Sequence, residues 1–149
     1  MYEDNVETPE EELKRADHLV FVSLKYTRTC DIMKNAVKRM IAADELSMSE
    51  FLENLRKNKA LAHVPGTIKE RVALVKNLLG NPGKKYMALY HLLKKIDKAE
   101  YTAIEEFRKN VTLKTKGTKS IDVKVENLYN YLEITKEFIA FRRQKINAK

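Results

Sequence analysis

The stretch ENLYNYLEITKEFIAFRRQ, residues 126–144, places apolar side chains at the spacing of an α-helix. These side chains form two stripes, one with Leu128, Leu132, Thr135 and Ile139 and the other with Tyr131, Ile134, Phe138 and Phe141. A helix that is apolar on two sides contacts more than one neighbour. We therefore expect the last helix either to be central to the fold or to supply a dimer interface.

Signals for helix starts recur along the preceding chain. Thr8-Pro9-Glu10-Glu11 combines a capping Thr, a Pro at the first helical position and a Glu that completes a capping box, and it predicts a first helix over about 9–27. A second helix is expected from Asp31. The similar pattern Ser47-Met48-Ser49-Glu50 predicts that the chain restarts there as a short helix through Leu55 or Leu61.

Two further helices are expected before the spacing of apolar residues changes from that of a helix to the alternation of a strand. Pro65-Gly66 ends the preceding segment, Thr67 opens a helix, and Gly80-Asn81-Pro82-Gly83 stops it. The pattern from Lys84 to Lys109 predicts the longest uninterrupted helix, with Ala103 and Phe107 on its core stripe.

Residues 111–125 alternate with a period of two around Gly117, which predicts a small β-hairpin that lies against the helices. The expected fold class is therefore all-α, an up-and-down bundle of about five helices with a β-hairpin before the last helix. Because the chain has 149 residues, we expect one domain over 9–149 after an acidic tail at 1–8.

The charge of the chain is unevenly distributed. The net charge is +8, from 29 basic and 21 acidic residues, but the first 13 residues hold six acids and no base. The rest of the chain therefore sets 29 bases against 15 acids, an excess of +14. A positive field of this size attracts polyanions, although a lysine-rich exterior can also serve solubility alone.

Several functional classes find no support in the sequence. No apolar stretch approaches the roughly 18 residues of a membrane span, and one cysteine, Cys30, permits no internal disulfide, which favours a cytoplasmic location. The four glycines form no phosphate-binding loop. His18, His63 and His91 are scattered, so we expect no metal site and no cofactor.

The most suggestive segment for function runs from Phe107 to Lys119 and contains no acid. Its candidate nucleic-acid-binding residues are the cations and one amide, Arg108, Lys109, Asn110, Lys114, Lys116 and Lys119. Alternation on a hairpin puts Lys114 and Lys116 on one exposed face, where they can contact several phosphates. The alternative is a lysine-rich edge that only resists aggregation between strands.

Two stretches of the chain resemble a known family. Arg15-Ala16-Asp17-His18-Leu19-Val20-Phe21-Val22-Ser23 is similar to the first helix of small archaeal helical proteins related to the HEPN (higher eukaryote and prokaryote nucleotide-binding) domains. The end of the chain is also similar, with Arg108-x-Asn110 at a helix end followed by a long last helix rich in Tyr, Leu and Phe. The resemblance implies a four- or five-helix bundle that dimerises. It also implies RNase activity, often as a toxin paired with a nucleotidyltransferase-like antitoxin.

The chain departs from this family at the catalytic motif, which is an Arg, four to six residues, and a His at the start of the last helix. Arg108 and Asn110 match its first part, but no histidine follows them. The spacing occurs elsewhere in Arg56 and His63, which are therefore the weak catalytic candidates. If the resemblance holds, it implies a member that binds or pairs rather than cleaves.

The leading hypothesis is thus a non-catalytic, dimeric HEPN-like module that binds nucleic acid, RNA in preference to DNA, through a basic surface. The first alternative is a metal-independent RNase in which His63 acts as general base and Arg56 stabilises the developing phosphorane charge. The second is a structural or partner-binding subunit without a nucleic-acid role, in which the basic charge meets an acidic partner and the apolar last helix forms a dimer interface.

Overall fold

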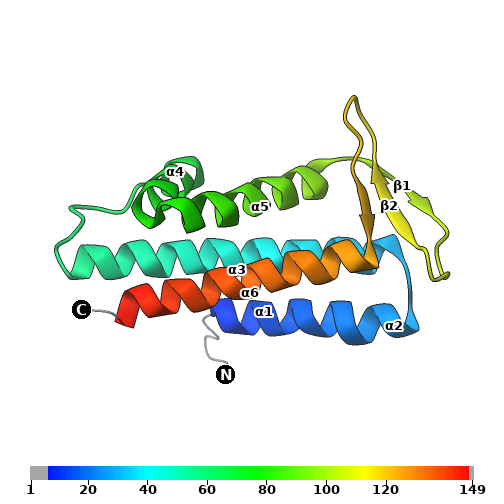
Figure 1. Ribbon diagram of the computed structural model, residues 1–149, viewed down its shortest axis with the longest axis horizontal. Helices are drawn as coiled ribbons and strands as arrows, with labels where there is room; N and C mark the ends of the chain where they lie inside the picture. Colours follow the sequence, from blue (N-terminus) through cyan, green and yellow to red (C-terminus); the bar gives the residue numbers. More distant parts are fainter. Residues whose placement is uncertain (1–6, 148–149) are drawn as a thin grey trace, which may run out of the picture.

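The structure, a computed structural model, describes residues 7–147 and is mostly helical (Figure 1). A small antiparallel sheet interrupts the helices just before the last one, as the sequence predicted. The elements are α1 (Pro9–His18), a π-helical turn η1 (Leu19–Ser23), α2 (Leu24–Tyr26), α3 (Cys30–Lys57), α4 (Ile68–Leu79), α5 (Asn81–Lys98), β1 (Tyr101–Ile104), β2 (Thr112–Thr115), β3 (Asp122–Lys124) and α6 (Val125–Asn147).

Helix α3 is the centre of the molecule. Helices α1, α5 and α6 all pack on it, and the sheet lies at the end where α3 begins (Figure 1). Its buried side chains, among them Met33, Met40 and Leu52, join one continuous core with Leu93 of α5 and Leu132 of α6. Both apolar stripes of α6 face the rest of the chain, because α6 contacts α1, α3 and α5. This agrees with the expectation of a central last helix.

The first helical segment begins and ends as predicted. Thr8 and Glu11 form the capping box, and helical structure continues through Tyr26. The buried positions Ala16, Val20 and Leu24 are four residues apart, which is wider than the 3.6-residue turn of an α-helix. The π-helical turn at Leu19–Ser23 accommodates this wider spacing and keeps all three side chains in the core.

The predicted restart at Ser47 is wrong, because α3 runs without a break from Cys30 to Lys57. Ser47 is buried in the middle of the helix beside Met48. The capping-box pattern is only a local signal, and the burial of Phe51 and Leu52 against the core favours continuing the helix.

The turn between α4 and α5 is shorter than the sequence indicated. Gly80 ends α4 with a positive φ of 69°, and α5 begins at Asn81 rather than at Lys84, with Pro82 in its first turn. Gly83 lets the two helices approach closely, since a Cβ there would lie 2.8 Å from the Cβ of Leu79. Helix α5 therefore folds back directly on α4.

The prediction of one long helix over 84–109 is wrong for the second half of that range. Helix α5 ends at Lys98, and Tyr101–Ile104 forms an edge strand that pairs antiparallel with β2. Ala103 and Phe107 are therefore exposed rather than part of a core stripe. A short apolar run fits a strand as well as a helix, and pairing with β2 decides between them.

The predicted hairpin is confirmed as β2 and β3, within a sheet of strand order β1-β2-β3. Leu113 of β2 lies opposite Val123 of β3, and both are buried in the core. The hairpin therefore packs against the helices as expected. Residues 1–6 of the predicted acidic tail lie outside the described residues. Within residues 7–147, no helix has the length and apolar character needed to cross a membrane.

Candidate functional site

The loop between β2 and β3 brings three lysines around one shallow pocket. Lys116 and Lys119 come from this loop, and Lys95 comes from the last turn of α5. The pocket has a volume of about 370 Å³, and its other lining residues are Ala99, Thr115, Gly117, Thr118 and Ile121. No acidic residue lines it. Three lysine side chains and Thr118 therefore border one pocket.

The backbone of α5 opposes these lysines weakly. The C-terminal end of a helix carries about half a negative elementary charge, and Ala99 caps that end beside the pocket. Three lysine charges outweigh this partial charge. The pocket consequently favours anions.

Lys114 is exposed on the sheet but lies between two different neighbours. Its cross-strand partners are Thr102 on β1 and Asp122 on β3. Side chains directly opposite each other on antiparallel strands are close enough to interact. Asp122 therefore compensates part of the charge of Lys114, so Lys116 and Lys119 are the freer cations of the hairpin.

Arg108, Lys109 and Asn110 do not lie at a helix end, which corrects the placement that the family resemblance implied. They form part of the turn between β1 and β2 and are exposed. The turn is fixed to the chain before α3, because the Phe107 amide donates to the carbonyl of Arg28 at 2.7 Å. The Arg28 guanidinium in turn donates to the carbonyl of Lys109 at 3.4 Å.

The backbone of this turn is unusual. Glu105 and Phe107 have positive φ angles of 53° and 67°, a region that residues with a side chain seldom occupy. The Glu106 carboxylate accepts from the backbone amide of Cys30 at 2.8 Å, at the N-terminus of α3. These contacts hold the turn in one position against the helices.

The predicted cations therefore fall into two groups rather than one patch. The Arg108–Asn110 group and the Lys116–Lys119 group lie at opposite ends of β2. Strands rise about 3.3 Å per residue, so the four residues of β2 between the two groups span about 13 Å. A ligand that contacts both groups must be extended.

Arg56 and His63 lie on different elements, Arg56 in the last turn of α3 and His63 in the loop that follows. The Arg56 guanidinium binds the Glu53 carboxylate, with Nε within 3.1 Å of both carboxylate oxygens. This contact lowers the pKa of Glu53. His63 lies exposed in the loop between α3 and α4, and within residues 7–147 no hydrogen bond links it to Arg56. The Arg56 guanidinium is therefore already partnered by the Glu53 carboxylate.

Cys30 is not a nucleophile in this structure. It is buried at the start of α3, and its thiol donates to the carbonyl of Thr112 at 3.4 Å. Burial, reinforced by the negative charge of Glu106, raises the pKa of Cys30 to about 11. The thiol therefore stays protonated at neutral pH and serves to join α3 to the sheet.

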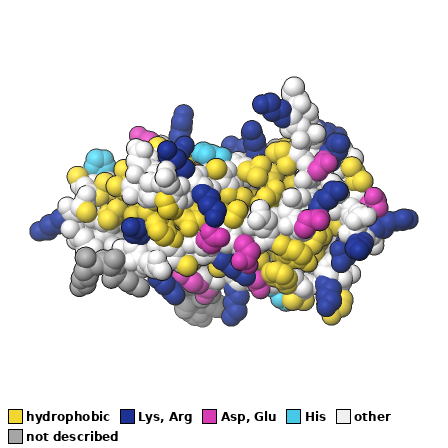
Figure 2. Space-filling model, viewed as in Figure 1, with side chains coloured by type: hydrophobic (Ala, Val, Ile, Leu, Met, Phe, Trp, Pro, Cys, Tyr) yellow, Lys and Arg dark blue, Asp and Glu magenta, His cyan; other side chains and the backbone are white. Residues whose placement is uncertain are grey.

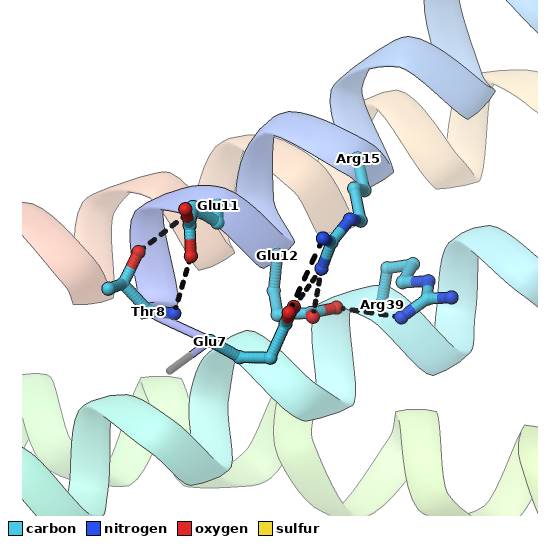
Figure 3. A network of polar contacts seen from close by, with 6 residues as sticks. All are labelled: Glu7, Thr8, Glu11, Glu12, Arg15 and Arg39. Carbon is cyan, nitrogen blue, oxygen red and sulfur yellow. Dashed lines mark hydrogen bonds and ion pairs between the residues drawn. The ribbon is translucent and has the colours of Figure 1, made fainter. Parts of the chain in front are cut away.

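The acidic first turn of α1 is only partly exposed to solvent. Glu12 is buried and bridges Arg15 of α1 and Arg39 of α3, at 2.6 and 3.1 Å (Figure 3). A hydrogen bond from Arg15 also lowers the pKa of Glu7 to about 2. These ion pairs border a groove of about 600 Å³ between α1 and α3. Its cations are compensated by neighbouring acids, so it is a weaker anion site than the lysine pocket.

The basic cluster near the C-terminus is also structural. Arg142 is buried and donates to Glu50 of α3 and Glu10 of α1, both at 2.8 Å, while Arg143 pairs with Glu10 at 3.1 Å. Arg142 thus joins three helices and does not extend a free basic surface.

Sequence reasoning missed Lys95 and Arg28, the residues that complete the two cationic groups. Lys95 belongs to a charged run on α5, and Arg28 to a short connection, so neither has a local signal that marks it. Their role depends on the sheet folding back beside them. In the part of the chain that the structure describes, no cluster of three or more His, Cys, Asp or Glu could hold a metal ion.

Comparison with family models, with curated protein sequences and with solved structures found no match to this chain.

Proposed function

We propose that this protein is a non-catalytic HEPN-like helical module that binds nucleic acid, RNA in preference to DNA. The observation that carries the proposal is the pocket formed by Lys95, Lys116 and Lys119, which no acid lines. A backbone phosphate there meets three cations at once. The excess of +14 outside the acidic N-terminal stretch supplies the long-range attraction.

Helices α1, α5 and α6 pack around α3 and run along the same axis as it does, which supports treating the chain as a helical bundle (Figure 1). Dimer formation and pairing with a nucleotidyltransferase-like protein stay predictions of the family resemblance. The RNase alternative has little support from the geometry, because the Arg56 guanidinium is already bound to the Glu53 carboxylate.

Binding of labelled mixed-sequence RNA and duplex DNA, measured by fluorescence anisotropy from about 50 mM salt upward, tests the proposal. The variant Lys95→Ala/Lys116→Ala/Lys119→Ala removes the pocket charges. Phosphate contacts release counterions, so the log–log salt slope for single-stranded RNA should flatten by about 0.7 per lost contact, or roughly 2 in total.

The matched control is Lys69→Ala/Lys76→Ala/Lys84→Ala, which removes the same charge from exposed positions on α4 and at the start of α5. We expect this control to keep most of the wild-type slope. Absence of any binding at about 50 mM salt, or equal losses in the two triple variants, would contradict the proposal.

A further inference from the structure

Large aromatic side chains are exposed together at the end of the molecule that carries the sheet. Phe21 and Tyr129 are 45% and 41% exposed, and Tyr26 and Phe107 are 81% and 73% exposed. Figure 2 shows an apolar patch over the ends of α1–α2 and the beginning of α6, with Lys and Arg side chains beside it. Exposed aromatic surface of this extent commonly marks a binding site.

Phe21 and Tyr129 form a preorganised pair of rings. Their centroids are 5.0 Å apart and their planes differ by 8°, so the rings are stacked. Phe21 lies in the π-helical turn, whose wider geometry keeps Val20 and Leu24 in the core and leaves Phe21 on the surface. π-helical turns occur often at functional sites because they reposition side chains in this way.

Two cations lie beside these rings without a compensating acid. Lys25 and Arg28 line a pocket of about 300 Å³ together with Phe21 and Tyr129, and no acidic residue lines it. Among the described residues, neither Lys25 nor Arg28 takes part in an ion pair. Two acids near the rings, Asp17 and Glu133, already pair with Lys136, which also lies over the Phe21 ring.

The ring pair is also continuous with the cationic turn of the sheet. Arg28 donates to the carbonyl of Lys109, and the Phe107 amide donates to the carbonyl of Arg28. Arg28 thus links the pocket beside the rings to the turn that carries Phe107 and Lys109. β2 then leads from this turn toward the lysine pocket at its other end.

From this arrangement we propose that the end of the molecule around Phe21 and Tyr129 binds single-stranded nucleic acid. The bases stack on the Phe21–Tyr129 pair, and the phosphates lie beside Lys25, Arg28 and Lys109. This inference rests on the proposed function and names its substrate class. In a duplex the base faces are covered by their neighbours, so only an unpaired strand offers faces to these rings.

The test compares a single-stranded RNA of about 12 nucleotides, a length within typical single-strand site sizes, with the same sequence as a duplex and with the matching single-stranded DNA. The variant Phe21→Leu/Tyr129→Leu keeps apolar side chains over the pocket but removes both rings. Single-strand affinity for RNA and DNA should fall about 10- to 100-fold, while duplex affinity stays the same. The salt slope should not change, because no charge is removed.

Ile68→Ala/Leu78→Ala is the matched control, since it removes two exposed apolar side chains from α4. Should the double Leu variant fold poorly by circular dichroism, Tyr26→Leu provides the second reading, because its ring is almost fully exposed. A several-fold loss of affinity in Tyr26→Leu that is confined to single strands also supports the proposal. Unchanged single-strand binding, or equal losses on duplex and single strand, overturns it.

The outcomes separate this inference from the proposed function. If the wild-type protein binds no nucleic acid, both fail. If it binds duplex and single strand through the lysine pocket and the ring variants bind normally, only this inference fails. A wild-type dimer that becomes a monomer in the ring variant, by light scattering and without loss of RNA binding, would assign the rings to a contact between copies of the chain.

Discussion

The C-terminal part of α6 and the loop between β2 and β3 both carry groups of basic side chains, but the two groups have different surroundings. Arg142 is buried between Glu10 and Glu50, so its charge joins α6 to α1 and α3. Lys116 and Lys119 surround a pocket that no acid lines. Cations that are available for a ligand are therefore recognised by the absence of acidic partners and not by their number.

The largest expected effect is on Arg142. Arg142→Met should destabilise the protein by about 2 kcal/mol, because it removes two charge-assisted hydrogen bonds from a buried side chain. Glu10 and Glu50 are partly exposed and can be rehydrated, which limits the loss. Urea denaturation measures the change. Arg143→Met is the control, and its exposed pair with Glu10 should contribute less than about 1 kcal/mol. Equal losses in the two variants would contradict the structural role of Arg142.

Asp44 should affect stability in the opposite sense to Arg142, because its buried carboxyl has an oxygen without a hydrogen-bond partner. Asp44 is fully buried in α3, and its Oδ2 atom has no hydrogen-bond partner in the structure. Burial, with a smaller effect of Glu45, raises the pKa of Asp44 well above its ordinary value of 3.8. Because the folded-state pKa is raised, the stability that Asp44 contributes is fully present below about pH 4 and is lost as the pH rises toward the folded-state pKa.

Asp44→Asn should therefore stabilise the protein at pH 7, by about 1 kcal/mol, since a neutral amide replaces a carboxyl that is costly to ionise. The gain should shrink as the pH falls toward 4. Thermal unfolding at several pH values measures it. Asp122→Asn, on the exposed strand β3, is the control and should show little pH-dependent difference. A stabilisation that does not vary with pH would show that Asp44 is not the titrating group.

The smallest expected effect on stability belongs to the lysine pocket. Lys95→Ala/Lys116→Ala/Lys119→Ala should change the free energy of unfolding by no more than about 0.5 kcal/mol per site, since none of the three forms an ion pair among the described residues. Urea denaturation beside the binding measurement tests this. An average loss per lysine comparable to that of Arg142→Met would mean that the lysines support the fold, and it would remove the contrast between the two basic groups.

Local features of the chain were predictable from the sequence because they depend on neighbours in sequence. The Thr8 capping box, the alternation around Gly117 and the start of the last helix all rest on hydrogen bonds or periodicities within a few residues. The candidate residues Lys116 and Lys119 were found in the same way, from their density along the chain. Each of these predictions lies within a few residues of the observed element.

Tertiary structure alone decided the features that depend on distant partners. Pairing with β2 turned Tyr101–Ile104 into a strand, and burial on the core carried α3 through the capping pattern at Ser47. Likewise, Glu50 and Glu10 made Arg142 structural, while the sheet brought Lys95 to the hairpin lysines. The physical reason is that strand pairing, burial and charge pairing join residues from 8 positions apart, as in Ile104 and Thr112, to 132 apart, as in Glu10 and Arg142. No short-range pattern records which of them will meet.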